Sequence, residues 1–394
     1  MRTSIEQALA DLFRWCRARD FAGHDPFDAL NSPVFQATPF ARSKTGRLVF
    51  TQLIKRFPVN LRALTGVLAQ KNAKGVALFA LAALANYRRL KTSETEGEAR
   101  GLLDDLIRLQ ITGYSGAAWG YNFDWQSRHF FATRDTPMIV PTAFAVHALL
   151  QAADTFKDEQ YLNIARSSCD FILHDLQRSV ATEDELCFSY SPIDQTCVFN
   201  ASMLAAETLA SVGAVIGESG FCDLAVRAAR YVVKRQRNDG AWAYGAAANQ
   251  AWVDNFHTGY VLQSLSRIVQ SCSGPESQVF SSALENGYEF WRERFFLADG
   301  WPKYYDDALY PADTHSAAAA IVTLLELQHL DSEALLLAEK IASWLLENMR
   351  DQRGFFYYQR KRFYTVRSPF MRWSQAWTAY ALARLLEERA KAHS

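Results

Sequence analysis

The sequence predicts an all-α protein with the architecture of an (α/α)6 barrel, in which six helical hairpins close into a toroid. Two observations predict it: an aromatic turn segment recurs five times, and apolar helices alternate with amphipathic ones. The turns recur at intervals of about 54 to 69 residues, and such recurrence indicates a repeated supersecondary unit. They read AAWGYNF at Trp119, LCFSYSP at Phe188, GAWAYGA at Trp242, DGWPKYY at Trp301 and GFFYYQR at Phe355.

The segments that follow the turns carry almost no charge and are rich in small residues, as in SAAAAIVTLLEL (316–327). A helix that is apolar on most sides is buried, so we assign these segments to an inner ring. With one helix from the N-terminal part, the inner helices are predicted at 76–90, 139–154, 198–216, 254–270, 313–328 and 371–388.

The remaining helices are amphipathic and carry their charges on one face, as in DSEALLLAEKIASWLLENMR (331–350). Because such helices expose their charged face, they are predicted to form an outer ring around the first. The outer helices are predicted at 3–19, 97–110, 158–178, 218–237, 278–296 and 332–350. Twelve helices in six pairs make one domain over residues 1–394. Two separate helical bundles are the alternative, but the repeat extends too evenly to favour them.

The segment 23–75 interrupts this pattern between the first outer and the first inner helix. It is rich in turn residues, as in GHDPFDALNSPVF and FPVNLRALTGVLAQKNAKG. We interpret it as a long loop-rich insertion. It either folds over the barrel mouth as a lid or buries the end of the barrel.

Composition limits the partners of the chain. Its 42 basic and 42 acidic residues give a net charge of zero, which argues against binding to nucleic acid or to an anionic membrane. The run Arg360 to Arg362 is most simply a solvated surface. We expect no membrane span, because some 20 apolar residues never run together. The N-terminus lacks an apolar signal-peptide core, and the six cysteines form no CxxC pair. Reduced thiols in a cytoplasmic protein are therefore predicted.

No cofactor is expected. The sequence has no HExxH, no clustered Cys and His residues and no EF-hand, so no metal is predicted. A P-loop and a GxGxxG are also absent.

In a ring of hairpins, the loops from outer to inner helices lie at one end, beside the N-termini of the inner helices. Residues distant in sequence therefore converge on one cavity, where six helix N-termini favour an anionic ligand. Aromatic rings suit the apolar faces of a sugar, and arginine forks suit carboxylate or sulfate groups. We expect an oligo- or polysaccharide, uronate-bearing chains included. The predicted substrate-binding residues are Trp119, Tyr121, Arg128, Trp242, Tyr244, Trp301, Tyr305, Arg367, Arg372 and Trp373.

Carboxylates at this end would serve hydrolysis, which needs two carboxyl groups that flank the scissile bond. Asp124, Asp254 and Asp313 are the first candidates. Two of them also have a structural interpretation: Asp254 lies where a helix N-cap belongs, and Asp313 follows Pro311 in a first turn.

Histidines at this end would serve epimerisation or β-elimination. These reactions need a base near a carbon-bound proton and neutralisation of the adjacent carbonyl or carboxylate. His257 and His315 fall at matching positions of two repeats and could act as the base, with Arg372 or Arg128 as the clamp. We favour a glycoside hydrolase narrowly over a uronate lyase or epimerase. A non-catalytic glycan-binding protein is the third interpretation.

Several long segments resemble a family of uncharacterised bacterial proteins encoded in exopolysaccharide clusters. They are FAGHDPFDALNS, FPVNLRALTG, SGAAWGYNFDWQSR, NQAWVDNFHTGY, DGWPKYYDDALYPADTHSAAAA and RSPFMRWSQAWTAYAL. The resemblance implies a fold similar to six-hairpin glycosidases and α/α-toroids. It also implies a setting in bacterial surface-polysaccharide production, with polysaccharide-assembly proteins as partners.

A second, shorter resemblance concerns QRNDGAW (236–242), which matches the Q-x-x-D-G-x-W motif of terpene cyclases, another group of α/α-toroids. The chain has neither the DxDD nor the DDxxD motif that cyclase chemistry requires. We therefore interpret this motif as structural, and a terpene-cyclase-like toroid is a minor alternative.

Overall fold

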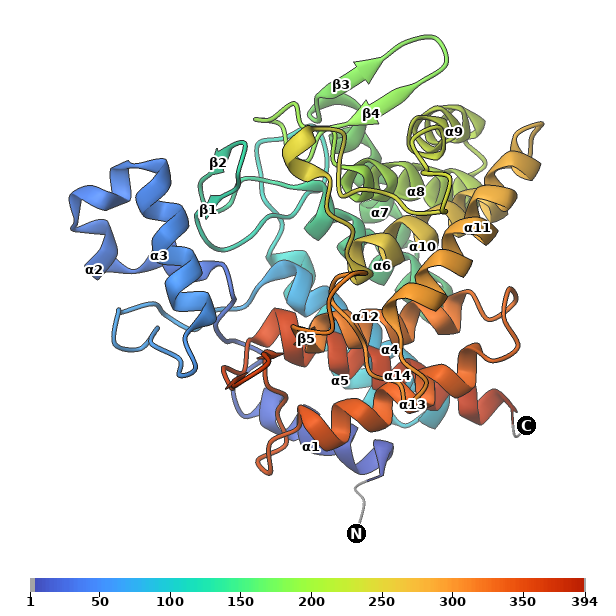
Figure 1. Cartoon of the computed structure of the whole chain (residues 1–394). Helices are drawn as coiled ribbons and strands as arrows, with labels where there is room; N and C mark the ends of the chain where they lie inside the picture. The colour runs from blue at the N-terminus through green and yellow to red at the C-terminus, as the bar shows by residue number, and fades with distance from the viewer. Residues whose placement is uncertain (1–3, 393–394) are drawn as a thin grey trace.

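The computed structural model describes residues 4–392 and confirms the predicted fold class. Six inner helices form a closed ring in which each packs against the next and α14 packs against α4 (Figure 1). They are α4 (Ala73–Leu90), α6 (Ile139–Phe156), α8 (Phe199–Ile216), α10 (Asn255–Ser271), α12 (Thr314–Glu326) and α14 (Trp377–Ala392). A π-helical turn, Met371–Ala376, leads into α14.

Six outer helices surround this ring. They are α1 (Ile5–Arg17), α5 (Ser93–Arg108), α7 (Glu159–His174), α9 (Ser219–Val233), α11 (Ser277–Phe295) and α13 (Ala334–Asn348). Each occupies a predicted outer segment; the predicted start of the first, at residue 3, lies outside the described residues. The difference in burial follows the sequence pattern, because every residue from 73 to 85 of α4 is buried, whereas α5 buries only one face.

Two inner helices, α6 and α8, have the length and the apolar composition of a membrane span. Most of their residues are buried inside the protein, 61% for α6 and 78% for α8. The closed ring accounts for this composition, since an inner helix contacts other helices on nearly all sides.

Short antiparallel strands lie in the loops that lead from outer to inner helices. β1 (Trp125–Gln126) pairs with β2 (Phe131–Ala132), and β3 (Arg178–Ala181) pairs with β4 (Leu186–Phe188). β5 (Ala312–Asp313), β6 (Gln359–Arg360) and β7 (Thr365–Val366) form a three-stranded sheet. This sheet connects the last two loops and fixes the N-terminus of α12.

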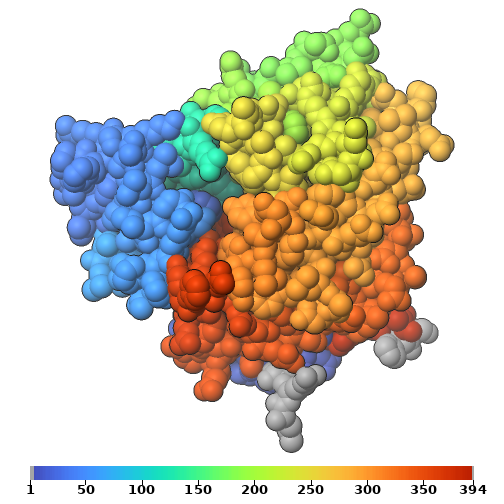
Figure 2. All heavy atoms as spheres, in the orientation of Figure 1, coloured from blue at the N-terminus to red at the C-terminus, as the bar shows by residue number. Residues whose placement is uncertain are grey.

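The inserted segment contains regular structure that the sequence analysis did not predict. Its main element is α3 (Lys44–Arg56), which begins at the N-cap Ser43, and shorter helical turns precede it: η1 (Asp28–Asn31), α2 (Pro33–Gln36) and η2 (Pro39–Arg42). The segment forms a lobe beside the barrel (Figures 1 and 2). The segment is a long insertion rich in turn residues, as predicted, but these turn residues separate short helices that the sequence analysis did not identify.

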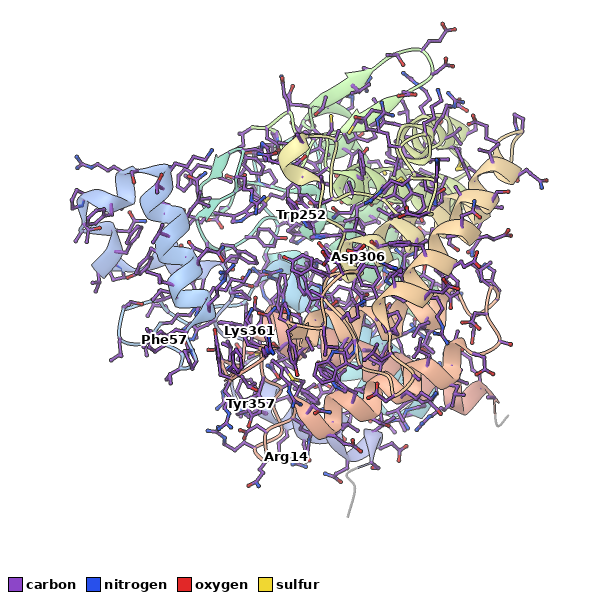
Figure 3. The ribbon with its side chains drawn as sticks, in the orientation of Figure 1. Arg14, Phe57, Trp252, Asp306, Tyr357 and Lys361 are labelled. Carbon is purple, nitrogen blue, oxygen red and sulfur yellow. A yellow bond between two sulfur atoms is a disulfide. The ribbon has the colours of Figure 1, made fainter. Side chains whose placement is uncertain are left out.

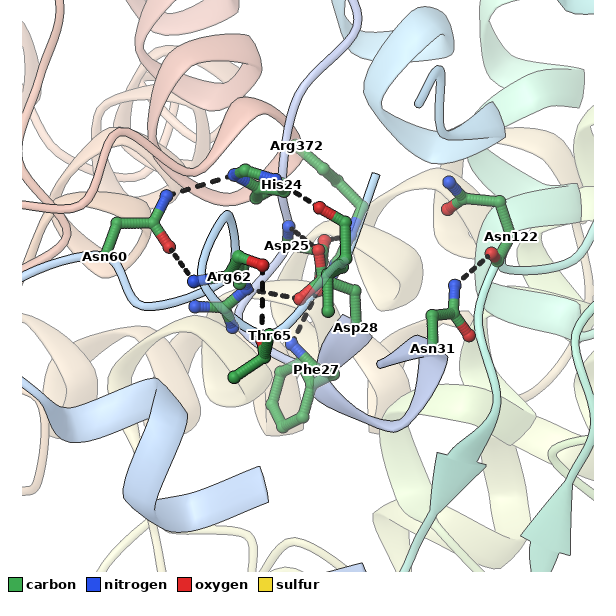
Figure 4. A network of polar contacts seen from close by, with 11 residues as sticks. His24, Asp25, Phe27, Asp28, Asn31, Asn60, Arg62, Thr65, Asn122 and Arg372 are labelled. Carbon is green, nitrogen blue, oxygen red and sulfur yellow. Dashed lines mark hydrogen bonds and ion pairs between the residues drawn. The ribbon is translucent and has the colours of Figure 1, made fainter. Parts of the chain in front are cut away.

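A buried polar network ties the start of this lobe to the barrel (Figure 4). Asp25 accepts two hydrogen bonds from Arg372, and Asp28 accepts one from Arg62. Asn60 contacts the His24 ring at 3.0 Å. Burial raises the pKa of Asp28 to about 6, although the Arg62 charge opposes that shift.

The cysteines depart from the prediction of reduced thiols. A disulfide joins Cys222 of α9 to Cys272, the residue that ends α10, with 5.5 Å between their Cα atoms. This distance lies in the normal range for disulfides. Outer and inner helices of one hairpin bring the two residues together, although they are 50 positions apart. The other four cysteines are free thiols.

Candidate active site

The N-terminal ends of the inner helices enclose a cavity of about 140 Å³, which we call the inner cavity. All six inner segments contribute to its wall, so the predicted convergence of the loops on one end is observed. The lining residues are Phe27, Lys74, Tyr121, Phe123, Trp125, Val140, Tyr190, Asn200, Tyr244, Phe256, His257, Tyr260, Tyr304, His315, Arg372 and Trp373. This wall contains aromatic rings, two imidazoles and two cations, but no carboxylate.

A larger outer cleft, of about 500 Å³, adjoins the inner cavity and shares several of its lining residues, His257 and Tyr244 among them. Leu48 and Gln52 of α3 form one wall, and Trp252 and Asp254 lie on another. Figure 2 shows a recess where the lobe, the residues near 125 and the residues near 300 meet. Figure 3 shows Trp252 on the side of the barrel that faces α3.

His257 is held by Asp254 at the first turn of α10. One carboxylate oxygen accepts the backbone N–H of His257 at 3.0 Å, and the other lies 2.7 Å from its Nδ1. Trp252 donates its indole N–H to the same carboxylate at 3.1 Å. Because a carboxylate only accepts hydrogen bonds, Nδ1 carries the proton and the lone pair of the neutral ring is on Nε2. His257 lines both cavities and is therefore a candidate base.

A second acid–base group lies in the same cavity. The hydroxyl of Tyr260 is 2.7 Å from His315 Nε2, and Lys74 donates to that hydroxyl at 3.3 Å. Burial, followed by the charges of Lys74 and Arg372, lowers the pKa of His315 well below its usual value. Burial also raises the pKa of Tyr260 well above its usual value. Both groups are therefore neutral near pH 7 and share one hydrogen bond.

Lys74 is a buried amine among aromatic rings. Its Nζ lies 4.2 Å from the ring centroid of Phe144 and 5.5 Å from that of Trp377. Within residues 4–392 it forms no ion pair with a carboxylate. Burial lowers its pKa well below the usual value, and the Arg372 charge adds to this effect. The amine can donate hydrogen bonds to a ligand in the cavity.

Two polar atoms of cavity-lining residues are buried without a hydrogen-bond partner among the described residues. They are Nδ1 of His315 and Oδ1 of Asn200. Buried polar groups in native proteins are nearly always paired. Two residues of the cavity wall therefore each keep one buried polar atom unpaired.

The predicted catalytic role of Asp313 does not fit its position. Its carboxylate caps α12 by accepting the N–H groups of His315 and Ser316 at 2.9 and 3.2 Å. It also accepts from Gln359 at 2.9 Å and from Trp373 at 3.0 Å. Asp313 is fully buried and lines neither cavity. Its contacts hold the start of α12 and the Trp373 ring in place. Burial raises its pKa to about 6.

Asp124 also lies outside both cavities. Its carboxylate accepts the backbone N–H of Arg134 at 2.8 Å, and its own N–H donates to Asn31 at 3.2 Å. The residue therefore joins its loop to the inserted lobe. Asp254 is the single predicted carboxylate that lines the outer cleft, and its two oxygens are occupied by the contacts described above.

Six of the ten predicted substrate-binding residues line the cavities. Tyr121, Tyr244, Arg372 and Trp373 face the inner cavity, and Arg128 and Tyr305 face the outer cleft. Arg372 is not a free clamp, because Asp25 binds its Nε and Nη2 atoms. Arg128 donates to the carbonyl of Asn249 and lies over the Trp252 ring.

The other four residues have structural positions. Trp119 and Trp242 are buried and donate their indole N–H groups to the carbonyls of Leu106 and Val232, near the ends of α5 and α9. Trp301 likewise donates to a carbonyl in its own loop. These tryptophans recur because each aromatic turn must be fastened to neighbouring backbone. Arg367 is exposed and lies over the Tyr357 ring.

Sequence reasoning missed several lining residues, of which Lys74 is the most informative. A charge in the first turn of an otherwise apolar buried helix was a usable signal, since the positive helix end disfavours a cation there. Tyr190, Tyr304 and Phe27 gave no such signal, because their loops reach the cavity only through the folded ring.

The chain matches no known protein-family profile and no curated protein sequence. Solved structures are similar to it at low sequence identity, and three examples span different enzymes. Cellobiose 2-epimerase from Bacillus thermoamylovorans superimposes with a TM-score of 0.62 at 13% identity, covering 82% of this chain and 90% of that one. D-mannose isomerase superimposes with a TM-score of 0.60 at 13% sequence identity, covering 82% of this chain and 87% of that one. The GH76 α-mannanase of Bacteroides thetaiotaomicron has a TM-score of 0.60 at 12% sequence identity, and the match covers 82% of this chain and 88% of that one.

The fold is shared. Epimerase, isomerase and glycosidase all carry the six-hairpin toroid, so the fold does not determine the reaction. Among the described residues, no group of three or more His, Cys, Asp and Glu side chains could hold a metal ion.

Proposed function

We propose that this protein is a sugar isomerase or 2-epimerase that moves a proton at the carbon next to the carbonyl of a reducing sugar. The observation that carries the proposal is that one cavity contains both His257 and the hydrogen-bonded pair of Tyr260 and His315. Abstraction of such a proton needs a base and donors for the negative charge that develops on oxygen. The fold neighbours that act on reducing sugars, an epimerase and an isomerase, support the substrate class.

Glycoside hydrolysis fits this geometry less well. Both hydrolytic mechanisms need two carboxyl groups on either side of the scissile bond. The inner cavity has none, and Asp313 and Asp124 lie outside both cavities. The sequence narrowly favoured a hydrolase. The cavity instead favours an enzyme that transfers protons through imidazole and phenol groups.

In the proposed mechanism, Nε2 of His257 accepts the C2 proton of the open-chain sugar. Asp254 fixes the tautomer and stabilises the imidazolium that forms, as the carboxylate of a catalytic triad does. Lys74 and the Nη1 group of Arg372, which Asp25 does not bind, serve as donors for the oxygen of the enediolate intermediate. Tyr260 gives its hydroxyl proton to carbon, and exchange with solvent then restores the Tyr260 hydroxyl and removes the proton from His257. Delivery to C1, with transfer of the O2 proton to O1, gives the ketose, and delivery to the opposite face of C2 gives the epimer.

The two cavities also suggest the size of the substrate. An inner cavity of about 140 Å³ suits one sugar unit, and an outer cleft of about 500 Å³ leaves room for others. Trp252 and Tyr244 are stacked at 4.5 Å on the wall of the cleft and offer aromatic surface to a second unit. We therefore propose an oligosaccharide whose reducing end enters the inner cavity.

The test is proton exchange in D2O. D-glucose, D-mannose and cellobiose would each be incubated with the protein, and NMR would follow loss of the C2 proton and appearance of the epimer or ketose. We expect exchange with the wild type and a loss of at least about 100-fold in His257→Ala, the scale of one acid–base group. His174→Ala, an exposed histidine of the outer helix α7, is the matched control and should keep full activity.

Other outcomes would identify other functions. New reducing ends from an oligosaccharide, without exchange at C2, would show a hydrolase. Binding of sugars with neither reaction would show a glycan-binding protein. Equal activity of wild type and His257→Ala would contradict the assignment of the base.

A further inference from the structure

Exposed apolar side chains are concentrated on the inserted lobe. Eight large apolar residues between Val34 and Leu68 are exposed, with Leu64 at 81% and Leu68 at 74%. Phe363, on the neighbouring loop between β6 and β7, is 86% exposed. Monomeric soluble proteins seldom expose apolar side chains in such density, and contiguous patches mark interaction sites.

The two segments that carry these side chains lie against one another. The hydroxyl of Tyr364 donates to the backbone carbonyl of Arg56 at 3.4 Å. Leu53 and Phe57 of the lobe, together with Tyr364, line a groove of about 510 Å³ between the segments. Figure 3 shows Phe57 and Lys361 on the two segments at the same side of the molecule. We call this surface the lobe patch: the exposed apolar residues between 34 and 68 with the loop 361–364.

The charge of the lobe patch has one sign. Residues 29–72 include seven Lys and Arg residues and no Asp or Glu. Arg62 is buried against Asp28 and Lys71 pairs with Asp20 and Asp105, which leaves Arg42, Lys44, Arg47, Lys55 and Arg56. Residues 352–372 include six more, of which Arg372 pairs with Asp25 and Arg353 with Asp351, leaving Arg360, Lys361, Arg362 and Arg367. This face therefore carries an excess of basic residues that the neutral net charge of the whole chain does not reveal.

We propose that the lobe patch docks on the surface of an anionic lipid bilayer. A bilayer offers both complementary features at once, because its headgroups attract the basic residues and its interfacial region accepts the apolar side chains. Arg56 and Arg362 are both exposed and directly precede the exposed Phe57 and Phe363 in the sequence. This combination of basic and apolar residues is typical of surfaces that bind in the interfacial plane.

Docking would also bring the mouth of the outer cleft close to the bilayer. Leu48 and Gln52 line both the groove of the patch and the outer cleft. The mouth of the cleft therefore lies beside the bilayer, where a glycan attached to a lipid can enter it. This second part rests on the proposed sugar-binding function, whereas membrane docking does not.

The experiment is co-sedimentation of the purified full chain with vesicles of phosphatidylcholine, with and without phosphatidylglycerol. We expect binding to the anionic vesicles only, and weaker binding at high salt. Arg56→Gln with Arg362→Gln should weaken binding roughly fivefold for each cation removed. Leu64→Ser with Leu68→Ser and Phe363→Ser should weaken it by at least about tenfold. Val215→Ser with Val279→Ser, two exposed residues of α8 and α11, is the matched control and should bind like the wild type.

Three results would overturn the proposal. They are absence of binding to anionic vesicles, equal binding to phosphatidylcholine alone, and equal loss in the control variant. Sedimentation velocity would be run without lipid on the same proteins. A dimer that the patch variants dissociate would instead make this surface an interface between two copies. None of these readouts depends on turnover, so the proposed isomerase activity is tested separately.

Discussion

Arg372 and Asp25 form a bidentate ion pair in which Nε and Nη2 of the guanidinium donate to the two carboxylate oxygens at 2.5 and 2.8 Å. Both side chains are buried, with 3% and 4% of their surface exposed. The pair joins the inserted lobe to the helical turn that precedes α14 (Figure 4). It also fixes the Arg372 guanidinium in the wall of the inner cavity.

Asp25→Asn should therefore destabilise the protein by about 3 kcal/mol, because the substitution leaves the Arg372 charge buried and unpaired. Urea unfolding would measure the change. Asp154→Asn removes an exposed ion pair with Lys157 and should cost less than about 0.5 kcal/mol. A similar small cost for Asp25→Asn would mean that the pair contributes little to holding the lobe.

Asp254→Asn should separate the two tasks of Asp254. Asparagine caps helices as well as aspartate does, so the free energy of unfolding should change by less than about 1 kcal/mol. The carboxylate that orients His257 would be lost, and kcat for C2 exchange should fall by about 1,000-fold or more, as for other histidines deprived of their carboxylate.

Asp158→Asn is the matched control for this variant, because Asp158 caps the outer helix α7 and contacts no histidine ring. It should leave kcat unchanged. If Asp254→Asn keeps its activity and loses stability, the carboxylate is a cap alone and His257 needs no orienting partner.

The disulfide between Cys222 and Cys272 should contribute to stability through the loop of 50 residues that it closes. Loop-closure entropy for this length predicts a contribution of about 4 kcal/mol as an upper value. The double variant Cys222→Ala with Cys272→Ala should therefore unfold at lower urea than the oxidised wild type. Wild type treated with a reductant should match the variant. Equal midpoints for oxidised and reduced wild type would show that the bond does not stabilise the fold.

The fold could be predicted from the sequence because helix packing itself requires the alternation of apolar and amphipathic helices. Inner helices contact helices on nearly all sides and must be apolar, whereas outer helices must be amphipathic. The twelve barrel helices of the described chain follow that rule. The same pattern failed for α3, which is a basic helix that buries only Thr51 and Ile54.

The candidate cavity lies where the sequence predicted it, at the N-terminal ends of the inner helices, and some of the predicted residues line it. His257 was predicted because it matches His315 in another repeat, and Tyr244 because it belongs to a recurring aromatic turn. Asp313 was assigned to catalysis, yet four N–H donors already occupy its oxygens. The sequence shows that a carboxylate stands at a helix start, but it does not show which way the second oxygen faces.

Asp313→Asn should reveal a pH-dependent contribution to stability. Burial raises the pKa of Asp313 from 3.8 to about 6 in the folded protein, so between these values the folded state binds a proton that the unfolded state has released. Stability from this group is therefore greatest at low pH and declines as the pH rises to about 6. Asparagine does not titrate, and the substitution should cost about 2 kcal/mol more at pH 4.5 than at pH 7. Urea unfolding of both proteins at the two pH values measures the difference.

Asp28, whose pKa is also about 6, is present in both proteins, so its titration cancels. A cost that is equal at both pH values would mean that the four N–H donors keep Asp313 ionised throughout. A cost that is larger at pH 7 would mean that they lower its pKa below 3.8.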